Sequence, residues 1–201
     1  SLAPNVTSQK WRINNYQKPL VAASPYAYLA ERFRDKAMAG VTAPGDCLLS
    51  SLLPKPSGLY WCSGNPARTG TLGGNSSTGT KVWFIDESLI FWGDVTLQNS
   101  SDTLVIVVKN NITIQTGVTR IDAVLIAGGT IRTTTSDSQL KGNQLVINGA
   151  VYGGNLNFNR KLSSTATCAG GIVPCTNVAQ PTAKIAYDPK YLVALTDLLG
   201  S

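Results

Sequence analysis

Four segments of the chain repeat one pattern of apolar and corner residues, at 89–97, 106–114, 125–133 and 145–153. Each segment begins with a short apolar strand, continues through a glycine or asparagine corner, and ends in a second short strand. One such coil cannot bury its own apolar face, so copies must stack on one another. The repeat therefore predicts that the chain is mainly β and forms a short right-handed parallel β-solenoid, or β-helix.

Aligning the four segments without gaps predicts which side chains stack inside the solenoid. The segments are unevenly spaced, so we expect loops of different lengths between strands that keep their register. Glycine or asparagine at each corner tolerates φ > 0. An antiparallel sandwich is the alternative, but its hairpins would need turns between successive strands. The predicted inward columns are Leu89, Ile106, Leu125 and Leu145; Phe91, Val108, Ala127 and Ile147; Val95, Ile112, Ile131 and Val151; and Leu97, Ile114, Thr133 and Gly153.

Two helices are predicted to flank the solenoid. Ser24 is a good N-cap with Pro25 at the first helical position, and Gly40 ends this helix. We expect it to cover an end of the solenoid, where strands would otherwise lie unpaired. Asp188 caps a second, C-terminal helix. The predicted apolar faces are Tyr26, Leu29, Ala30, Phe33 and Ala37 in the first helix and Leu192, Leu195 and Leu199 in the second.

These elements divide the chain into three predicted parts. Residues 1–80 form a helical, disulfide-looped N-terminal cap, residues 81–160 form the solenoid, and residues 161–201 form a disulfide loop and a C-terminal helix that packs on the solenoid. At the start of the solenoid, Val82, Trp83, Phe84 and Ile85 are apolar residues in an unbroken row. Such a run predicts a strand that is buried on both faces.

The four cysteines occur as two local pairs, Cys47 with Cys62 and Cys168 with Cys175. Three disulfide connectivities are compatible with four cysteines, and the nearest-neighbour one is favoured over the others and over four buried thiols. The chain lacks both histidine and a Cys-x-x-Cys motif, so no metal site and no cofactor is predicted. Two disulfides favour an oxidising, extracellular location at the cell surface.

The formal net charge is +6, and residues 1–80 hold +5 of it, whereas residues 81–160 are neutral. The solenoid faces therefore have no electrostatic basis for binding a nucleic acid. No segment approaches the ~20 apolar residues of a transmembrane helix. The abrupt beginning of the chain suggests a trimmed ectodomain, so we expect membrane contact only through an anchor outside this fragment.

The absence of histidine excludes Ser-His-Asp and Cys-His catalysis. A polysaccharide lyase or hydrolase built on a β-helix is the enzymatic alternative, and its candidate residues are Asp94, Asp102, Asp122, Lys109, Arg120 and Arg132. No second carboxylate follows Asp94 in its predicted column, so the carboxylate pair of a glycosidase is not indicated. A lone carboxylate at Asp94, or the Asp86-Glu87 pair, is weak evidence for calcium. We expect a non-enzymatic protein.

Ligand contact is instead expected from exposed aromatic and basic side chains. Trp92 lies opposite the inward side of its strand and is a candidate for stacking on sugar rings, although packing under a helix is an equal alternative. The predicted outward column consists of Thr96, Thr113, Arg132 and Tyr152. Only the first two positions of this column are threonine, which disfavours an ice-binding face. The candidate ligand-contact residues are Trp92, Arg132 and Tyr152.

Residues 89–158, with the stretch NGAVYGGNLNF at 148–158 and the tail YDPKYLV at 187–193, resemble solenoid modules of large exported bacterial surface proteins. Such modules occur mainly in reduced-genome bacteria that live attached to other cells, and some are associated with type IV pili. The resemblance implies an extracellular structural or adhesive role. The partner would be a host-cell surface, a glycan or the subunits of a filament. Its motifs are structural, so it transfers no functional residue.

Overall fold

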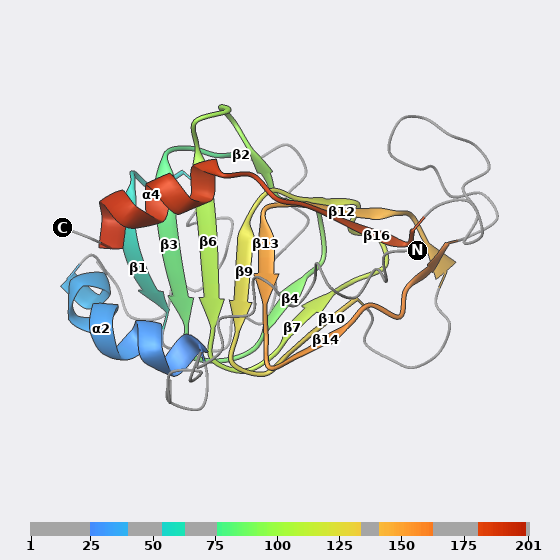
Figure 1. Cartoon of the computed structure of the whole chain (residues 1–201), viewed down its shortest axis with the longest axis horizontal. Coiled ribbons are helices and arrows are strands. Elements are labelled where there is room, and N and C mark those ends of the chain that lie inside the picture. Colours follow the sequence, from blue (N-terminus) through green and yellow to red (C-terminus); the bar gives the residue numbers. More distant parts are fainter. Residues whose placement is uncertain (1–24, 40–53, 63–75, 134–140, 163–180, 200–201) are drawn as a thin grey trace, which may run out of the picture.

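The computed structural model describes residues 25–39, 54–62, 76–133, 141–162 and 181–199. Three parallel sheets wrap around one axis, and two helices lie outside them (Figure 1). The first sheet contains β1 (Gly58–Cys62), β3 (Thr80–Ile85), β6 (Thr103–Val108), β9 (Val124–Ala127) and β13 (Ala150–Tyr152), in that order. The second contains β4 (Leu89–Phe91), β7 (Ile112–Ile114), β10 (Thr130–Arg132) and β14 (Asn155–Asn157); the third contains β8 (Arg120–Ile121), β12 (Leu145–Asn148) and β16 (Ala183–Ala186).

The chain visits the first, second and third sheets in turn and then begins the next coil. Two further short pairs are also parallel: β2 (Ser76–Ser77) with β5 (Thr96–Leu97), and β11 (Lys141–Gly142) with β15 (Lys161–Leu162). Strands that follow one another in sequence thus belong to different sheets and do not form hairpins. The predicted parallel solenoid is confirmed, and the antiparallel sandwich is excluded.

The predicted register is correct only for the central coils. Ile106 pairs with Leu125, Val108 with Ala127, and Ile112 with Ile131, as the columns required. The first segment, however, is displaced by one sheet. Leu89 pairs with Ile112 rather than contributing to the column of Ile106, so the predicted pairing of Leu89 with Ile106 is wrong. The partners of Ile106 in the preceding and following coils are instead Trp83 and Leu125.

The displacement arises because the step from Leu89 to Ile106 is shorter than one full coil, which runs from Leu89 to Ile112. The intervening segment includes a turn at 99–102 that is closed by hydrogen bonds between Asn99 and Asp102. The last segment also departs from the predicted columns, because the coil from Val124 to Ala150 is longer than the coil from Val105 to Val124. The other misplaced column members are Phe91, which pairs with Ile114; Leu97, which pairs with Ser77; Leu145, which pairs with Ala183; Ile147, which pairs with Ile121; Val151, which pairs with Leu125; and Val95, which forms a bridge with Ile121.

The interior of the solenoid is apolar and excludes solvent. Leu89, Ile106, Leu125, Ile131 and Ile147 each have no exposed surface, and they belong to one continuous cluster that spans all three sheets. The predicted stacking of Leu, Ile and Val therefore describes the core correctly, even where the partners differ.

The corner at Gly149 requires glycine. Its φ is +156°, and a Cβ there would lie 2.1 Å from the carbonyl oxygen of Ala123 in the preceding coil. At Gly129 φ is not positive, but a Cβ would lie 2.5 Å from Oδ1 of Asn111. Close approach of neighbouring coils, as much as a left-handed backbone, explains the small residues at these corners.

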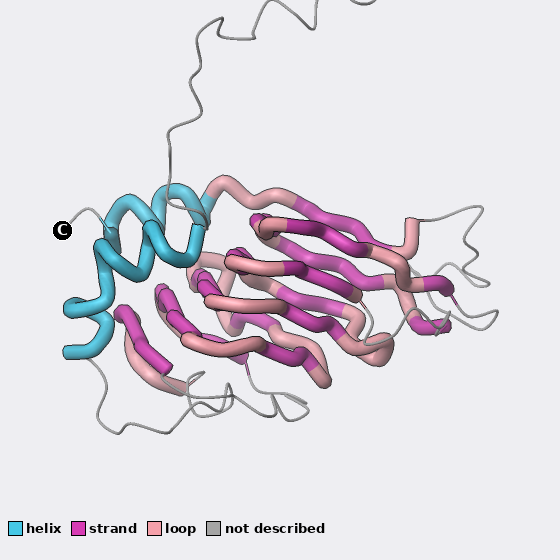
Figure 2. The backbone as a smooth tube through the Cα atoms, turned by 90° about the horizontal axis from the view of Figure 1, so that it is seen from below, coloured by secondary structure: helices cyan, strands magenta, loops and turns pink. Residues whose placement is uncertain are grey.

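Strand β3 is buried on both faces, as the apolar run at 82–85 predicted. The outer face of the first sheet presents a second apolar cluster, which includes Val82, Phe84 and Val107. Helix α2 (Pro25–Ala39) covers this face with the predicted residues Tyr26, Ala30, Phe33 and Ala37. The helix contacts both β1 and β9. It thus lies across the outer face of the sheet, and our prediction that it covers an end of the solenoid was wrong (Figure 2).

Helix α4 (Lys190–Leu199) begins as predicted, because the carboxylate of Asp188 accepts a hydrogen bond of 3.0 Å from the amide of Lys190. Its packing residue differs from the prediction. Tyr191 is 2% exposed and belongs to the outer apolar cluster, whereas Leu192 is 58% exposed. The side chains of Leu195 and Leu199 lie outside the described part of the structure. The first turn of the helix therefore packs through Tyr191 and not through Leu192.

Candidate functional site

The acidic residues considered for catalysis are bonded to backbone amides of neighbouring coils. Asp94 accepts hydrogen bonds from the amide and the hydroxyl of Thr119, both 2.6 Å, and from the amide of Arg120 at 3.0 Å. Asp102 accepts from the amides of Gly79 and Asn99, each at 2.8 Å. Such bonds satisfy backbone donors at the turns, where no strand partner is available. Both carboxylates therefore hold adjacent coils together.

Asp122 is the most enclosed of these carboxylates, at 4% exposure. It accepts hydrogen bonds from Nε of Arg120 at 2.8 Å, from Nδ2 of Asn148 at 2.6 Å and from the amide of Leu97 at 3.3 Å. Three donors from three coils fix its position. The pKa of Arg120 lies above its ordinary value, chiefly because of the hydrogen bond to Asp122.

The other predicted site residues lie apart from one another. Trp92 follows β4 in the second sheet and is 48% exposed; Tyr152 ends β13 in the first sheet and is 52% exposed. Arg132 is exposed on β10, and its Nε donates a 3.0 Å hydrogen bond to the hydroxyl of Thr113. Thr113 and Arg132 pair side by side as predicted, although Thr113 is only 4% exposed. Lys109 is exposed beyond β6.

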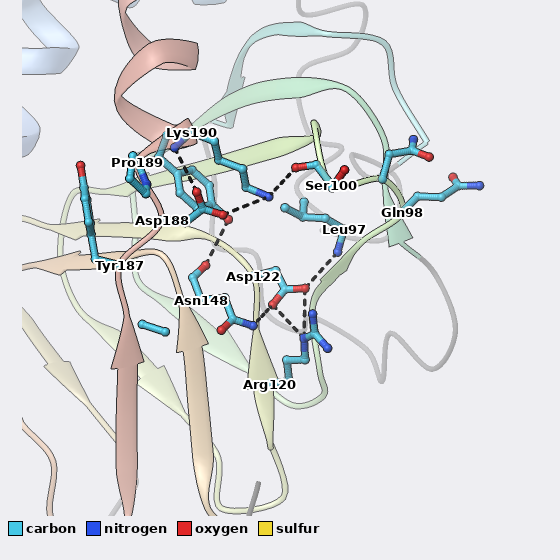
Figure 3. A pocket seen from close by; sticks show the side chains of 13 residues that line it. Leu97, Gln98, Ser100, Arg120, Asp122, Asn148, Tyr187, Asp188, Pro189 and Lys190 are labelled. Carbon is cyan, nitrogen blue, oxygen red and sulfur yellow. Dashed lines mark hydrogen bonds and ion pairs between the residues drawn. The ribbon is translucent and has the colours of Figure 1, made fainter. Parts of the chain in front are cut away.

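A pocket of about 460 Å³ does bring polar side chains from several coils together (Figure 3). Arg120 and Asp122 come from the region of β8, and Asn148 ends β12. Residues 97–100, before β6, and residues 186–191, between β16 and α4, form the remaining walls. The volume falls within the range of roughly 300–1,000 Å³ that is typical of small-molecule sites.

Hydrogen bonds between separate elements fix the walls of this pocket. Nζ of Lys190 donates to the carbonyl oxygen of Ser100 at 3.0 Å and lies 3.6 Å from the carboxylate of Asp188. The hydroxyl of Tyr191 donates to the carbonyl oxygen of Asn148 at 3.1 Å. The start of α4 is thereby bonded to the turn before β6 and to the end of β12. The pKa of Tyr191 is raised above its ordinary value because the phenol is buried.

The pocket is balanced in charge. Its two cations, Arg120 and Lys190, each have a carboxylate partner, Asp122 and Asp188. About half of the Arg120 side chain, 55%, remains exposed to solvent. Within the described ranges, no hydrogen bond engages the Nη atoms of Arg120 or the side-chain amide of Gln98. The pocket therefore offers polar groups for a ligand but no net formal charge.

Arg160 is a buried cation that no sequence pattern indicated. It is 2% exposed, and its guanidinium donates to the carbonyl oxygens of Val118 at 2.6 Å, Asn143 at 3.0 Å and Gln115 at 2.5 Å. Burial lowers its pKa to about 10. The carbonyls come from two earlier coils, so the side chain joins three turns of the solenoid. Its functional group faces the protein interior, which indicates a structural role.

Some sequence predictions fall on parts of the chain that the structure does not describe. Cys62 ends β1 and is 3% exposed, but Cys47, Cys168 and Cys175 lie outside the described residues. Their pairing stays a prediction. Among the described residues, no cluster of three or more His, Cys, Asp or Glu side chains is arranged to hold a metal ion. No helix in these ranges is long and apolar enough to cross a membrane.

The fold defines the chain as a β-solenoid protein whose first sheet carries an outer helical layer, with a polar pocket at the start of α4. No protein-family model, curated protein or solved structure matches the chain. Its function must therefore be inferred from the geometry of its own residues.

Proposed function

We propose that this chain is a non-enzymatic, extracellular surface module that binds a partner on another cell, such as a surface glycan. The observation that carries the proposal is the pocket of about 460 Å³ at the start of α4. It is open, polar and built from four separate parts of the chain. A rigid solenoid is a suitable support for such a site, because sites on rigid elements are held more accurately than sites on isolated loops.

The use of the carboxylates supports a binding role over an enzymatic one. Asp94 and Asp102 accept hydrogen bonds from backbone amides of adjacent coils, and Asp122 is held by three donors. A general acid or base must exchange protons with a substrate at hydrogen-bond distance. Carboxylates engaged in this way support the coils rather than such chemistry.

The proposal is tested by measuring adherence and turnover together. Fluorescently labelled protein should bind to a panel of bacterial and eukaryotic cells, and enzymatic removal of surface glycans should reduce that binding. The same preparation should leave a panel of polysaccharides intact, as followed by reducing-end release. Depolymerisation in the absence of any adherence would instead favour a β-helix lyase or hydrolase.

An extracellular location makes a separate prediction about the cysteines. Peptide mapping of exported protein under non-reducing conditions should recover Cys47 linked to Cys62 and Cys168 linked to Cys175. Reduction should lower the free energy of unfolding by about 3 kcal/mol for a bridge that closes ~15 residues. Recovery of four free thiols from exported protein would contradict the assignment to an oxidising compartment.

A filament subunit is the second candidate function. The last strands of the three sheets, β13, β14 and β16, expose Tyr152 (52%), Leu156 (44%) and Ile185 (43%). Within the described ranges, no strand pairs with the free edge of any of these three strands. A parallel edge can be extended by a strand from a second copy of the chain, and such head-to-tail contacts generate filaments. Sedimentation velocity should then show assembly that grows with concentration and that Leu156→Lys reduces; a monomer at all concentrations would remove this candidate.

A further inference from the structure

We propose that the pocket at the start of α4 binds a neutral oligosaccharide, one sugar unit of which stacks on an aromatic side chain. This inference rests on the proposed function, because it names the class of ligand that the surface module would recognise. It is argued from the charge balance of the pocket, from its available polar groups, from an exposed aromatic ring and from the rigidity of its walls.

Because the pocket has no net formal charge, it has no net positive charge that would favour an acidic ligand over a neutral one. Arg120 forms an ion pair with Asp122 at 2.8 Å, and Lys190 lies 3.6 Å from Asp188. An acidic ligand would have to compete with both carboxylates for the same cations. A ligand without formal charge loses little by entering such a site, provided that its hydroxyl groups find partners.

The available polar groups are of the kinds that sugar hydroxyls need. The Nη atoms of Arg120 are donors, and the side-chain amide of Gln98 offers both a donor and an acceptor. Asp188 is half exposed and can accept from a hydroxyl. Vicinal hydroxyl groups of a pyranose act as donor and acceptor at once. They therefore match a pocket that offers both donors and acceptors.

Tyr187 supplies the apolar surface that a sugar ring also requires. It lines the pocket and is 53% exposed, and Figure 3 shows it across the pocket from Gln98. An exposed aromatic side chain offers a large rigid contact area with few rotatable bonds. The C–H face of one sugar unit can stack on that ring, while the hydroxyl groups of a neighbouring unit of the same oligosaccharide reach the Arg120 and Gln98 side of the pocket.

The walls are already ordered before a ligand binds. Asp122 is 4% exposed and accepts three hydrogen bonds, and Asn148 donates to Asp122 while its carbonyl oxygen accepts from Tyr191. These bonds fix the floor of the pocket, so binding need not order it. The ligand would have to order only Gln98, Tyr187 and the end of Arg120.

The test combines a glycan array with a matched pair of tyrosine variants. The intact chain is screened on immobilised neutral and acidic oligosaccharides, and the best neutral saccharide is then titrated by calorimetry. Tyr187→Ala should weaken binding about tenfold, because it removes the stacking surface. Tyr187→Phe should retain affinity within about twofold, since the ring remains. Gln98→Ala should weaken binding by about three- to tenfold, through the loss of hydrogen bonds.

Tyr152→Ala is the matched control, because Tyr152 is equally exposed at 52% but does not line the pocket. It should leave affinity unchanged. The proposal is overturned if no neutral saccharide binds, if Tyr187→Ala and Tyr152→Ala have equal effects, or if only acidic saccharides bind and lose affinity as salt rises.

Cell adherence separates this proposal from the broader one. Full adherence of the Tyr187→Ala protein would remove the pocket as the binding site while leaving the surface module intact. Wild-type protein that binds no cell and no glycan would remove both. A Tyr187→Ala protein that loses adherence, beside a Tyr152→Ala protein that retains it, would support both.

Discussion

Replacing Arg160 by methionine should destabilise the solenoid by about 3–5 kcal/mol, since it leaves three carbonyl oxygens without their donor. The guanidinium donates to the carbonyl oxygens of Gln115, Val118 and Asn143, at 2.5–3.0 Å. Leaving a buried acceptor without a donor costs about 1–3 kcal/mol each. The substitution also removes the cost of burying the charged guanidinium, which offsets part of that loss of stability. The net loss of stability is therefore smaller than the upper limit of about 9 kcal/mol that three unsatisfied acceptors would give.

Urea unfolding followed by circular dichroism gives the free-energy difference. Arg160→Lys should fall between wild type and Arg160→Met, at a loss of about 2 kcal/mol, because an ammonium cannot reach all three carbonyls at once. Lys184→Met is the control: Lys184 is exposed on β16, and its replacement should change stability by less than about 0.5 kcal/mol. If the free energy of unfolding of Arg160→Met lay within about 1 kcal/mol of wild type, the inference that Arg160 stabilises three turns of the solenoid would be wrong.

Three further predictions follow from the packing and titration of buried groups. Gly149→Ala should cost about 2–4 kcal/mol in urea unfolding, because its Cβ would lie 2.1 Å from a backbone oxygen, whereas Gly117→Ala should be nearly neutral, since nothing lies within 4 Å. Val95→Asp should unfold the central coils by burying a charge at a position with no exposed surface. Thr113→Asp should be much milder, because Arg132 already contacts that side chain. Burial raises the pKa of Tyr191 above its ordinary value of 10.0, so stability should be full below pH 10.0 and fall at higher pH, and Tyr191→Phe should flatten that loss.

The solenoid could be predicted from the sequence because its strongest signal, apolar alternation around small corners, is a property of every coil. Leu89 and Ile106 have the same local pattern, yet one begins a strand of the second sheet and the other lies in a strand of the first. Alternation with a period of two reports which face of a strand is buried. It cannot report which sheet the strand joins, because that depends on the length of the intervening turn. The step from Leu89 to Ile106 covers only part of a coil, because Leu89 reaches its paired residue only at Ile112.

The pocket could be predicted only in part, for a related reason. Arg120 and Asp122 are close in sequence, so the sequence could suggest that they act together. Lys190 and Tyr187 meet them only because the chain completes further coils and returns along β16 before α4 begins. Arg160 was missed because its partners are backbone carbonyl oxygens, which every residue has. A pattern of side-chain types alone therefore gives no signal for a residue that bonds to backbone atoms of other coils.

The placement of the charged residues links the stability of this fold to the proposed binding site. Because successive coils differ in length, the turns between strands leave some backbone donors and acceptors without strand partners. Asp94 and Asp102 accept hydrogen bonds from such amides, and Arg160 donates to such carbonyl oxygens. Asp122 serves the same purpose for Leu97, but it lies beside the half-exposed Arg120 and thus forms one wall of the pocket. The proposed binding site thus lies where one of these structural bridges reaches the surface. If so, Asp122→Asn should lower both saccharide affinity and the free energy of unfolding. Asp86→Asn should lower only the latter, because the Asp86 carboxylate accepts hydrogen bonds from Trp61 and Tyr26 outside the pocket.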